Sequence, residues 1–328
     1  MIHTSAAFLQ VYEEASSGWW IASFFDGAAS WANGIFVMIS GALFLEPRRE
    51  VSIRKLYCKN ILHLATVFLS WSLLYATAWA VFKKVSVYRW FGNVITGEYH
   101  MWFIHMLIGL YILVPILRKI TADEKTIGYF LIISGIFVFL IPTVLSLPMP
   151  FQASFAAVHE SRSKGLYLTY WVVHFVGGYY LSRTEFSVRQ RRILYAMGGM
   201  GFLMLLVSVW LGSCGPSNIA LPSTWGEIYS TMMGVGIFAL GKYQLSKSAF
   251  LERNRNRILR ISKYTLGSYM VHALFLEAID ELIGFDSLLL SPFSAAYMIP
   301  AIVLSVFFAS LGVSYIANHV PFFNKYIV

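Results

Sequence analysis

Residues 99–119, YHMWFIHMLIGLYILVPILRK, decide the class of this fold. Apart from two histidines, and two cations at its end, the stretch consists of apolar and aromatic residues with one glycine and one proline. As an α-helix it is long enough to cross about 30 Å of hydrocarbon. It therefore predicts a membrane-spanning helix, with His100 at one mouth of the span and His105 inside it.

Similar stretches recur along the chain, which is 58% hydrophobic and only 12% charged, with a mean hydropathy of +0.64. A soluble domain of 328 residues would carry far more charge on its surface. The sequence therefore predicts an all-α polytopic membrane protein that forms a single transmembrane domain over residues 1–328. Its nine clear spans lie near 28–46, 57–82, 99–119, 126–147, 166–182, 191–212, 223–241, 264–283 and 294–317.

Basic residues are distributed very unequally between the two sides of the membrane. If the loop after Leu45 is cytoplasmic and the sides then alternate, 20 of the 25 Lys and Arg residues lie inside and 5 outside. Because the loops of membrane proteins that stay in the cytoplasm are rich in Lys and Arg, this asymmetry predicts the orientation. The net charge of +9 reflects the topology and gives no reason to expect nucleic-acid binding.

A tenth apolar segment, Met1–Val11, is too short to cross a bilayer. The span at 28–46 runs from outside to inside, so this segment is expected to be the outer half of a first helix. We expect the natural start to lie upstream, which makes Met1 an internal methionine and gives about ten helices, the first one truncated. Mass spectrometry of the intact natural protein tests this, since a mature chain that begins at Met1 would contradict it.

Neither cysteine indicates a disulfide or a metal site. Cys58 lies on the predicted cytoplasmic side and Cys214 in an outer loop, and neither has the spacing of metal ligands. No Walker loop, dinucleotide fingerprint or Ser-His-Asp order stands out. We therefore expect no metal.

Histidines in or beside apolar spans are the first candidates for a functional site, because ionisable groups at membrane depth mostly face a bundle interior or a wet cavity. His100 and His105 lie about 140° apart around their helix, so both cannot point into one narrow cavity. We interpret His105 as incidental. We interpret His63 and His174 as structural, each held by a hydrogen bond to a backbone carbonyl.

The span at 264–283 carries a polar stripe. Thr265, Ser268, Tyr269 and His272 are spaced at helical steps and lie opposite an apolar back that contains Met270. Such a stripe lines either a polar helix contact or a cavity, and we favour the cavity.

The first span has a comparable but weaker pattern. Ser40 shares a helix face with Asn33 and Val37, and Gly34 and Gly41 lie beside that face. Small residues at this spacing let helices approach closely, so packing and a functional site are equally good interpretations.

The first inner loop carries cations that could bind an anionic cofactor, among them Arg48, Arg54 and Lys59. Arginine forks and lysine point charges both bind phosphate groups. Positive-inside topology together with anionic lipid accounts for the same residues without a cofactor. From the residues alone, both interpretations stay open.

Several of these segments together resemble the integral-membrane acyltransferase-3 family. The first-helix motif of that family has a histidine about ten positions after a basic residue, and here that position falls before Met1. Within the family, the sequence most resembles the enterobacterial common antigen O-acetyltransferase type. The matches occur in chain order at Met1-Ile2-His3-Thr4, at Phe36-Val37-Met38-Ile39-Ser40-Gly41, at Tyr99-His100-Met101-Trp102-Phe103, at Leu110 to Arg118, and at Ser268-Tyr269-Met270-Val271-His272.

The resemblance implies a membrane O-acyltransferase, in particular an O-acetyltransferase, of the bacterial inner membrane. The donor would be cytoplasmic acetyl-CoA or another acyl-CoA, and the acceptor a hydroxyl of an extracytoplasmic or lipid-linked surface glycan. His3 would act as general base or transient acyl carrier. His100 with Trp102 would orient the acceptor or stabilise developing charge. The remaining roles are substrate binding by Ser40, Tyr269 and His272, and binding of the CoA phosphates by Arg48, Arg54 and Lys59.

Two other classes of protein are compatible with the residues. A secondary transporter or flippase could use intramembrane histidines as a proton relay, although the repeats and broken helices typical of that class are not evident here. A non-catalytic membrane partner is the second alternative. Incorporation of label from acetyl-CoA into membrane glycans distinguishes an enzyme from both.

Overall fold

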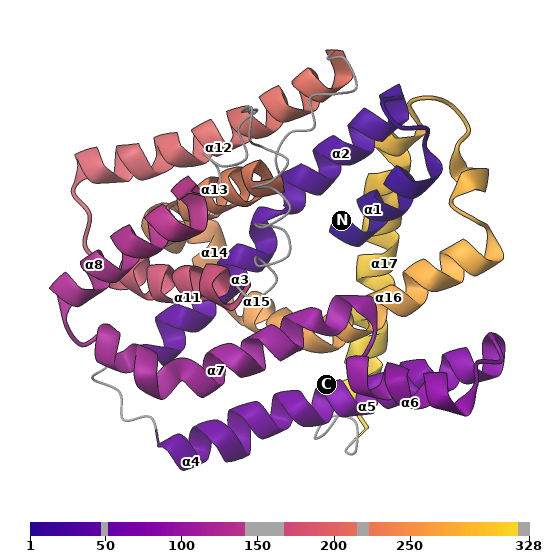
Figure 1. Ribbon diagram of the computed structural model, residues 1–328, viewed down its shortest axis with the longest axis horizontal. Coiled ribbons are helices and arrows are strands. Elements are labelled where there is room, and N and C mark those ends of the chain that lie inside the picture. Colours follow the sequence, from indigo (N-terminus) through magenta and orange to yellow (C-terminus); the bar gives the residue numbers. More distant parts are fainter. Residues whose placement is uncertain (47–51, 142–166, 215–222, 321–328) are drawn as a thin grey trace. The chain divides into compact units, whose positions relative to one another are not determined.

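The computed structural model describes residues 1–46, 52–141, 167–214 and 223–320, and this part of the chain is helical and contains no strand (Figure 1). Five helical stretches within it are long and apolar enough to cross a membrane. They are Ser17–Phe44, Ile53–Phe82, Val87–Ile120, Val188–Leu211 and Ser294–Asn318. The predicted all-α membrane fold is thereby confirmed, whereas the count of ten crossing helices and the upstream start stay predictions.

A helix occupies each of the nine predicted spans as far as the described residues reach. In chain order the elements are α1 (Ile2–Val11), α2 (Ser17–Ala29), α3 (Trp31–Phe44), α4 (Ile53–Lys55), η1 (Leu56–Ile61), α5 (Leu62–Phe82), α6 (Val87–Thr96), η2 (Tyr99–Met101), α7 (Trp102–Ile120), α8 (Glu124–Gly135), η3 (Ile136–Leu140), α11 (Tyr167–Arg183), α12 (Val188–Cys214), α13 (Ser223–Tyr243), η4 (Leu245–Lys247), α14 (Ala249–Arg253), α15 (Arg255–Ser262), α16 (Thr265–Leu282), η5 (Asp286–Leu288) and α17 (Ser294–Asn318). Prolines 115 and 300 lie inside α7 and α17.

The predicted start of the first span, near residue 28, was wrong. The chain is already helical from Ser17, through α2 and α3, which meet at Ser30. The side chain of Ser16 caps α2 by accepting a hydrogen bond from the Trp19 amide at 3.3 Å. Asp26 and the small residues of α2 lower the hydropathy of this segment, and for that reason the sequence pattern placed the start of the span too late.

The sequence pattern also missed α6, which follows α5 in the predicted outer loop. Ser86 caps this helix by accepting a hydrogen bond from the Arg89 amide at 3.3 Å. Gly97 ends it with a φ of 69°, in the left-handed region that glycine adopts without strain. A helix of only 10 residues gives no signal when a sequence is searched for membrane spans.

The chain divides into two compact units, and the divisions include points within α7 and α17. Unit 1 comprises Met1–Arg49, Val114–Glu252 and Phe285–Ala301. Unit 2 comprises Glu50–Leu113, Arg253–Gly284 and Ile302–Val328.

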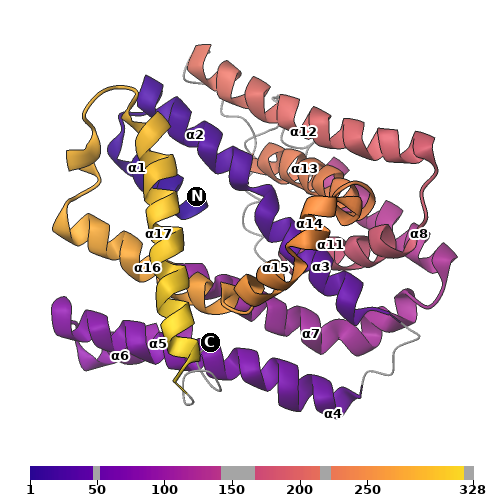
Figure 2. The ribbon, with the colours of Figure 1, turned by 180° about the vertical axis from the view of Figure 1, so that it is seen from behind.

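In unit 1, α3 packs closely against α11, and α12 lies beside α13 (Figures 1 and 2). A Cβ added at Gly41 would overlap the backbone carbonyl of Phe175, and one added at Gly178 would overlap the backbone of Met38. These glycines therefore let two backbones touch. Gly41, the neighbour of Ser40, thus has a packing role.

In unit 2, α5 lies beside α6 (Figure 2). The Tyr75 side chain of α5 is 1% exposed, and its hydroxyl donates a hydrogen bond to the Met270 carbonyl of α16 at 2.7 Å. A buried phenol needs such a partner, since an unsatisfied hydroxyl at this depth costs free energy. This bond ties α16 to α5.

Candidate functional site

The predicted site residues are distributed over both units. His3 and Ser40 belong to unit 1, and both side chains are half-buried. Arg48 lies outside the described residues. The other predicted site residues belong to unit 2, and they are Arg54, Lys59, His100, Trp102, Tyr269 and His272.

Three of the predicted residues in unit 2 come together as a histidine cluster, formed by His100, Tyr269 and His272. The Tyr269 hydroxyl donates a hydrogen bond to the backbone carbonyl of His100. The Nδ1 atom of His272 lies 2.5 Å from the carbonyl oxygen of Tyr269. The ring centroid of His100 is 5.0 Å from that of His272 and 5.5 Å from that of Tyr269. His100 comes from η2 and the other two residues from α16. Two elements far apart in the sequence thus bring the three rings together.

Aromatic rings enclose His100. Its side chain is fully buried, and the rings of Tyr75 and Tyr99 each lie edge-on to it at 5.5 Å between centroids. His105 is exposed instead, with its ring 4.2 Å from that of Phe68. His100 of η2 and His105 of α7 therefore lie in different environments, as their predicted angular separation suggests.

Only part of the predicted polar stripe on α16 belongs to this cluster. Thr265 is exposed, and the Ser268 hydroxyl donates to the carbonyl of Tyr264 in its own chain segment at 2.8 Å. Met270, on the face predicted to be an apolar back, is completely buried. The Tyr75 hydroxyl of α5 bonds the backbone carbonyl of Met270, a neighbour that helix phase alone does not reveal.

His3 lies on α1, which packs against α2. The other end of α1 is anchored by aromatic side chains within unit 1. Phe8 is fully buried with its ring 5.5 Å from that of Phe285, and the Tyr12 hydroxyl accepts a hydrogen bond from the Ala295 amide at 3.1 Å. The helix that carries His3 is therefore held at one end by the segment that begins α17.

The remaining predicted residues of unit 2 lie on its surface. Arg54 on α4 and Lys59 on the π-helical segment η1 are both exposed. The Trp102 side chain is 40% exposed at the start of α7. Exposure is compatible with binding of a ligand and equally with membrane or solvent contact.

His174, interpreted from the sequence as structural, is 2% exposed in unit 1. Its Nδ1 lies 3.0 Å from the carbonyl oxygen of Tyr170, and its Nε2 lies 3.2 Å from the Thr231 hydroxyl. Both ring nitrogens thus have partners, and one of them is the kind of carbonyl that the sequence interpretation expected.

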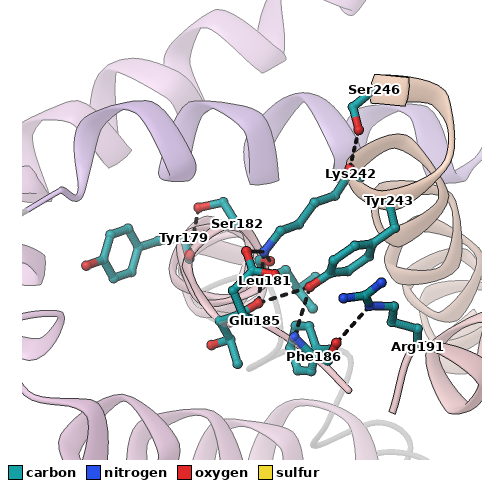
Figure 3. A network of polar contacts seen from close by, with 10 residues as sticks. Tyr179, Leu181, Ser182, Glu185, Phe186, Arg191, Lys242, Tyr243 and Ser246 are labelled. Carbon is teal, nitrogen blue, oxygen red and sulfur yellow. Dashed lines mark hydrogen bonds and ion pairs between the residues drawn. The ribbon is translucent and has the colours of Figure 1, made fainter. Parts of the chain in front are cut away.

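A second polar centre, which the sequence interpretation missed, lies where α11 ends and α12 begins; we call it the lysine corner (Figure 3). The Lys242 ammonium of α13 donates to the carbonyls of Leu181 at 3.2 Å and Thr184 at 2.8 Å, and pairs with the Glu185 carboxylate at 3.3 Å. These contacts use all three of its N–H groups. They also satisfy carbonyls at a helix C-terminus, where cations are favourable.

Tyr243 and Arg191 complete the lysine corner (Figure 3). The Tyr243 hydroxyl accepts from the Phe186 amide at 2.9 Å and donates to the Thr184 carbonyl at 3.2 Å. Arg191 donates to the Phe186 carbonyl at 2.7 Å and stacks 3.9 Å above the Tyr243 ring. Ser187 and Gln190 add a reciprocal capping box that starts α12.

The end of α3 is completed in a similar way. Arg118 donates to the Glu46 carbonyl at 2.6 Å, the Thr121 hydroxyl donates to the Leu45 carbonyl at 3.0 Å, and Arg183 pairs with the Glu46 carboxylate. In the sequence, a cation stands near each of these helix ends. These cations contributed to the predicted orientation, but nothing in the sequence assigned them a capping role.

No group of three or more His, Cys, Asp and Glu side chains within the described residues is placed to hold a metal ion.

A sequence model described as an acyltransferase domain, that of the acyltransferase-3 family, matches residues 1–319. The match covers all of the predicted site residues. No curated protein and no solved structure matches the chain.

Proposed function

The chain belongs to the acyltransferase-3 family and is a membrane acyltransferase, and we propose that it is an O-acetyltransferase. The donor in this proposal is cytoplasmic acetyl-CoA or another acyl-CoA. The acceptor is a hydroxyl of an extracytoplasmic or lipid-linked surface glycan, and the subfamily is the enterobacterial common antigen type. The observation that carries the proposal is the histidine cluster, in which two imidazoles and a phenol meet inside a family-matched chain.

The chemistry requires a base, because a sugar hydroxyl has a pKa far above neutral. In the direct route, His3 takes the hydroxyl proton while the oxygen attacks the thioester carbonyl; the C–S bond breaks, and the imidazolium returns the proton to the CoA thiolate. In the carrier route, a His3 nitrogen attacks the thioester carbonyl, the C–S bond breaks, and the CoA thiolate takes up the imidazole proton. The glycan oxygen then attacks the acyl carbon, the acyl–nitrogen bond breaks, and the released imidazole takes up the hydroxyl proton. A histidine suits either role because its pKa lies near neutral.

The histidine cluster supports a role of His100 in holding the acceptor. A carbonyl oxygen only accepts, so Nδ1 of His272 carries the proton that it shares with the Tyr269 carbonyl. Tyr269 in turn fixes the backbone at His100. In this proposal His100 and Trp102 orient the acceptor hydroxyl, and Ser40, Tyr269 and His272 are each assigned to substrate binding.

Binding of the CoA phosphates is assigned to Arg48, Arg54 and Lys59. Arg54 and Lys59 present exposed cations on α4 and η1. On the predicted topology this segment faces the cytoplasm, where acyl-CoA is found. A cation there attracts phosphate by charge and, for arginine, by a paired hydrogen-bond geometry.

The test is incorporation of label from acetyl-CoA into membrane glycans by the full-length protein. His3→Ala and His100→Ala are each expected to lower the initial rate by about 10²–10⁴-fold, the usual contribution of acid–base residues. His105→Ala is the matched control, because it removes an exposed histidine of α7 only five residues after His100. Rates of wild-type level in both variants would refute the site assignment. A folded wild type that incorporates no label would instead favour a transporter, a flippase or a non-catalytic partner.

The topology has a separate test, because Cys58 is an exposed free thiol on the predicted cytoplasmic side. With Cys214 replaced by serine, a membrane-impermeant maleimide should label Cys58 in inverted vesicles and leave it unlabelled in intact cells. Labelling in intact cells would reverse the predicted orientation.

A further inference from the structure

We propose that a pocket in unit 2, next to the histidine cluster, is the subsite for one sugar ring of the acceptor. The pocket has a volume of about 140 Å³. The inference that the bound sugar is the one acylated rests on the proposed function; the inference that the pocket binds a sugar rests on its lining. That lining consists of Tyr75, Ala76, Trp79, Asn93, Gly97 and Glu98.

Three adjoining segments form the walls of the pocket, namely α5, α6 and the turn at Gly97. Tyr75, Ala76 and Trp79 lie on one face of α5, and Asn93 lies on α6, which packs beside it. Gly97 closes the turn with its positive φ, and a Cβ there would meet the ring of Phe68 at 2.7 Å. The pocket is therefore formed before any ligand arrives, which lowers the entropic cost of binding.

The Glu98 carboxylate is fixed by hydrogen bonds and can still accept a further one. Its Oε2 accepts a hydrogen bond from the Trp79 indole N–H at 2.8 Å, and its Oε1 accepts one from the Tyr99 amide at 3.3 Å. The Met101 amide also donates to the Glu98 side chain in the cap of η2. A carboxylate has about four lone-pair sites, so about one is left for a hydroxyl donor. The half-buried Asn93 side chain adds an acceptor and a donor, and a sugar hydroxyl uses both kinds of partner.

Trp79 supplies an aromatic surface beside these polar groups. The Lys83 ammonium lies 4.5 Å from the centroid of its ring and is itself held by Glu281 at 3.0 Å. The negative face of an aromatic ring favours positively polarised hydrogens. Lys83 already makes this contact with the Trp79 ring, so Trp79 serves the pocket through its N–H bond to Glu98. Glu98 and Asn93 present the groups that a sugar hydroxyl can bind.

Size and position favour the acceptor over acyl-CoA. A pocket of about 140 Å³ suits a single sugar ring better than CoA, which is several times larger than one ring. On the predicted topology, residues 83–98 lie outside, where the acceptor is. Tyr75 forms one wall of the pocket, and its ring lies 5.5 Å from that of His100. A ring bound here would have its hydroxyls near the histidine cluster.

Binding is tested without catalysis by saturation-transfer NMR on the detergent-solubilised full-length protein. The probes are the methyl glycosides of glucose, galactose, mannose and N-acetylglucosamine. We expect transfer to the ring protons of at least one glycoside, and a fivefold to tenfold weaker affinity in Glu98→Gln, roughly the difference between a charged and a neutral hydrogen bond. The glutamine keeps an oxygen for the Trp79 N–H, so the fold should survive. Glu281→Gln, which removes the same charge outside the pocket lining, is the matched control and should bind like wild type.

The two proposals fail separately. If no glycoside binds to folded wild type, or if Glu98→Gln binds as well as Glu281→Gln, the pocket is not a sugar subsite, even where label is still transferred to glycans. If a glycoside binds and the Glu98→Gln defect appears, but wild-type membranes transfer no acyl group, the sugar site stands and the proposed acyl transfer fails. Where transfer is measurable, Glu98→Gln should raise the KM for the acceptor fivefold to tenfold and leave the KM for acyl-CoA unchanged.

Discussion

The histidine cluster of unit 2 and the lysine corner of unit 1 are both buried polar groups that join helices, but their polar atoms are used differently. In the corner, Lys242 donates to two backbone carbonyls and one carboxylate, so its contacts are fixed. In the cluster, the contacts of His100 with Tyr269 and His272 are largely ring to ring. Lysine only donates, whereas imidazole and phenol both donate and accept.

This difference separates a structural element from a reactive one. A cation whose three N–H groups are all bonded to carbonyls and a carboxylate stabilises a helix end and has no capacity left for a ligand. Imidazole rings, by contrast, can exchange protons with a hydroxyl at neutral pH. Substitutions in the two places should therefore lower different quantities, activity in the cluster and stability in the corner.

The largest effect is expected for His100→Gln. Glutamine keeps a polar side chain of similar size but cannot titrate, so acyl transfer should fall by about 10²–10³-fold, the usual cost of removing one charge-stabilising group. The melting temperature should change little. Labelled-acetyl transfer at matched protein levels measures the first quantity, and thermal unfolding in detergent measures the second. Loss of folding with His100→Gln would place the cluster in the same structural class as the corner.

The reverse pattern is expected for Lys242→Met. The apolar chain is kept, but the Leu181 carbonyl loses the ammonium donor and the Thr184 carbonyl keeps only the Tyr243 hydroxyl, so the free energy of unfolding should fall by about 2 kcal/mol. Denaturation in mixed micelles measures this, with Lys247→Met as control because Lys247 is exposed. Transfer activity per folded molecule should stay near that of wild type; a large loss would make the corner part of the catalytic machinery.

A smaller effect is expected for Tyr269→Phe, which removes only the hydroxyl that bonds the His100 carbonyl. The ring contacts remain, so the rate should fall about tenfold, equivalent to about 1.4 kcal/mol for one hydrogen bond. Comparison of kcat with KM for the acceptor tells whether Tyr269 acts on orientation or on affinity. An unchanged rate would show that the backbone at His100 needs no such support.

The smallest effect is expected at Asp123, an exposed cap of α8 that serves as a reference for both regions. Hydrogen bonds from the Thr126 hydroxyl and amide hold the pKa of the Asp123 carboxyl below its usual value near 4. Because the pKa in the folded state is depressed, the stabilisation is fully present above the usual pKa and is lost as pH falls through the folded-state value. Between about pH 5 and 3, the melting temperature of the wild type should fall by this small contribution, and that of Asp123→Asn should not.

The candidate site was predictable where a residue has an unusual type for its surroundings. His100, Tyr269 and His272 were identified because polar groups at membrane depth are rare, and the structure brings these three together. Glu98 and Trp79 were not identified as a pair, although Glu98 stands two residues before His100. Their bond depends on the turn at Gly97 and on the packing of α6, neither of which has a hydropathy signal.

Composition and apolar periodicity by themselves determined the helical membrane fold and the approximate positions of the spans, because a bilayer demands long apolar helices whatever their neighbours are. Only the tertiary structure decided that Lys242 and Arg118 complete helix ends, and that Met270 on the apolar face of α16 is buried beside Tyr75. The physical reason is that hydrogen bonds and ring contacts depend on which helices meet. Sequence spacing fixes the direction of a side chain around its own helix but not the partner that it finds there.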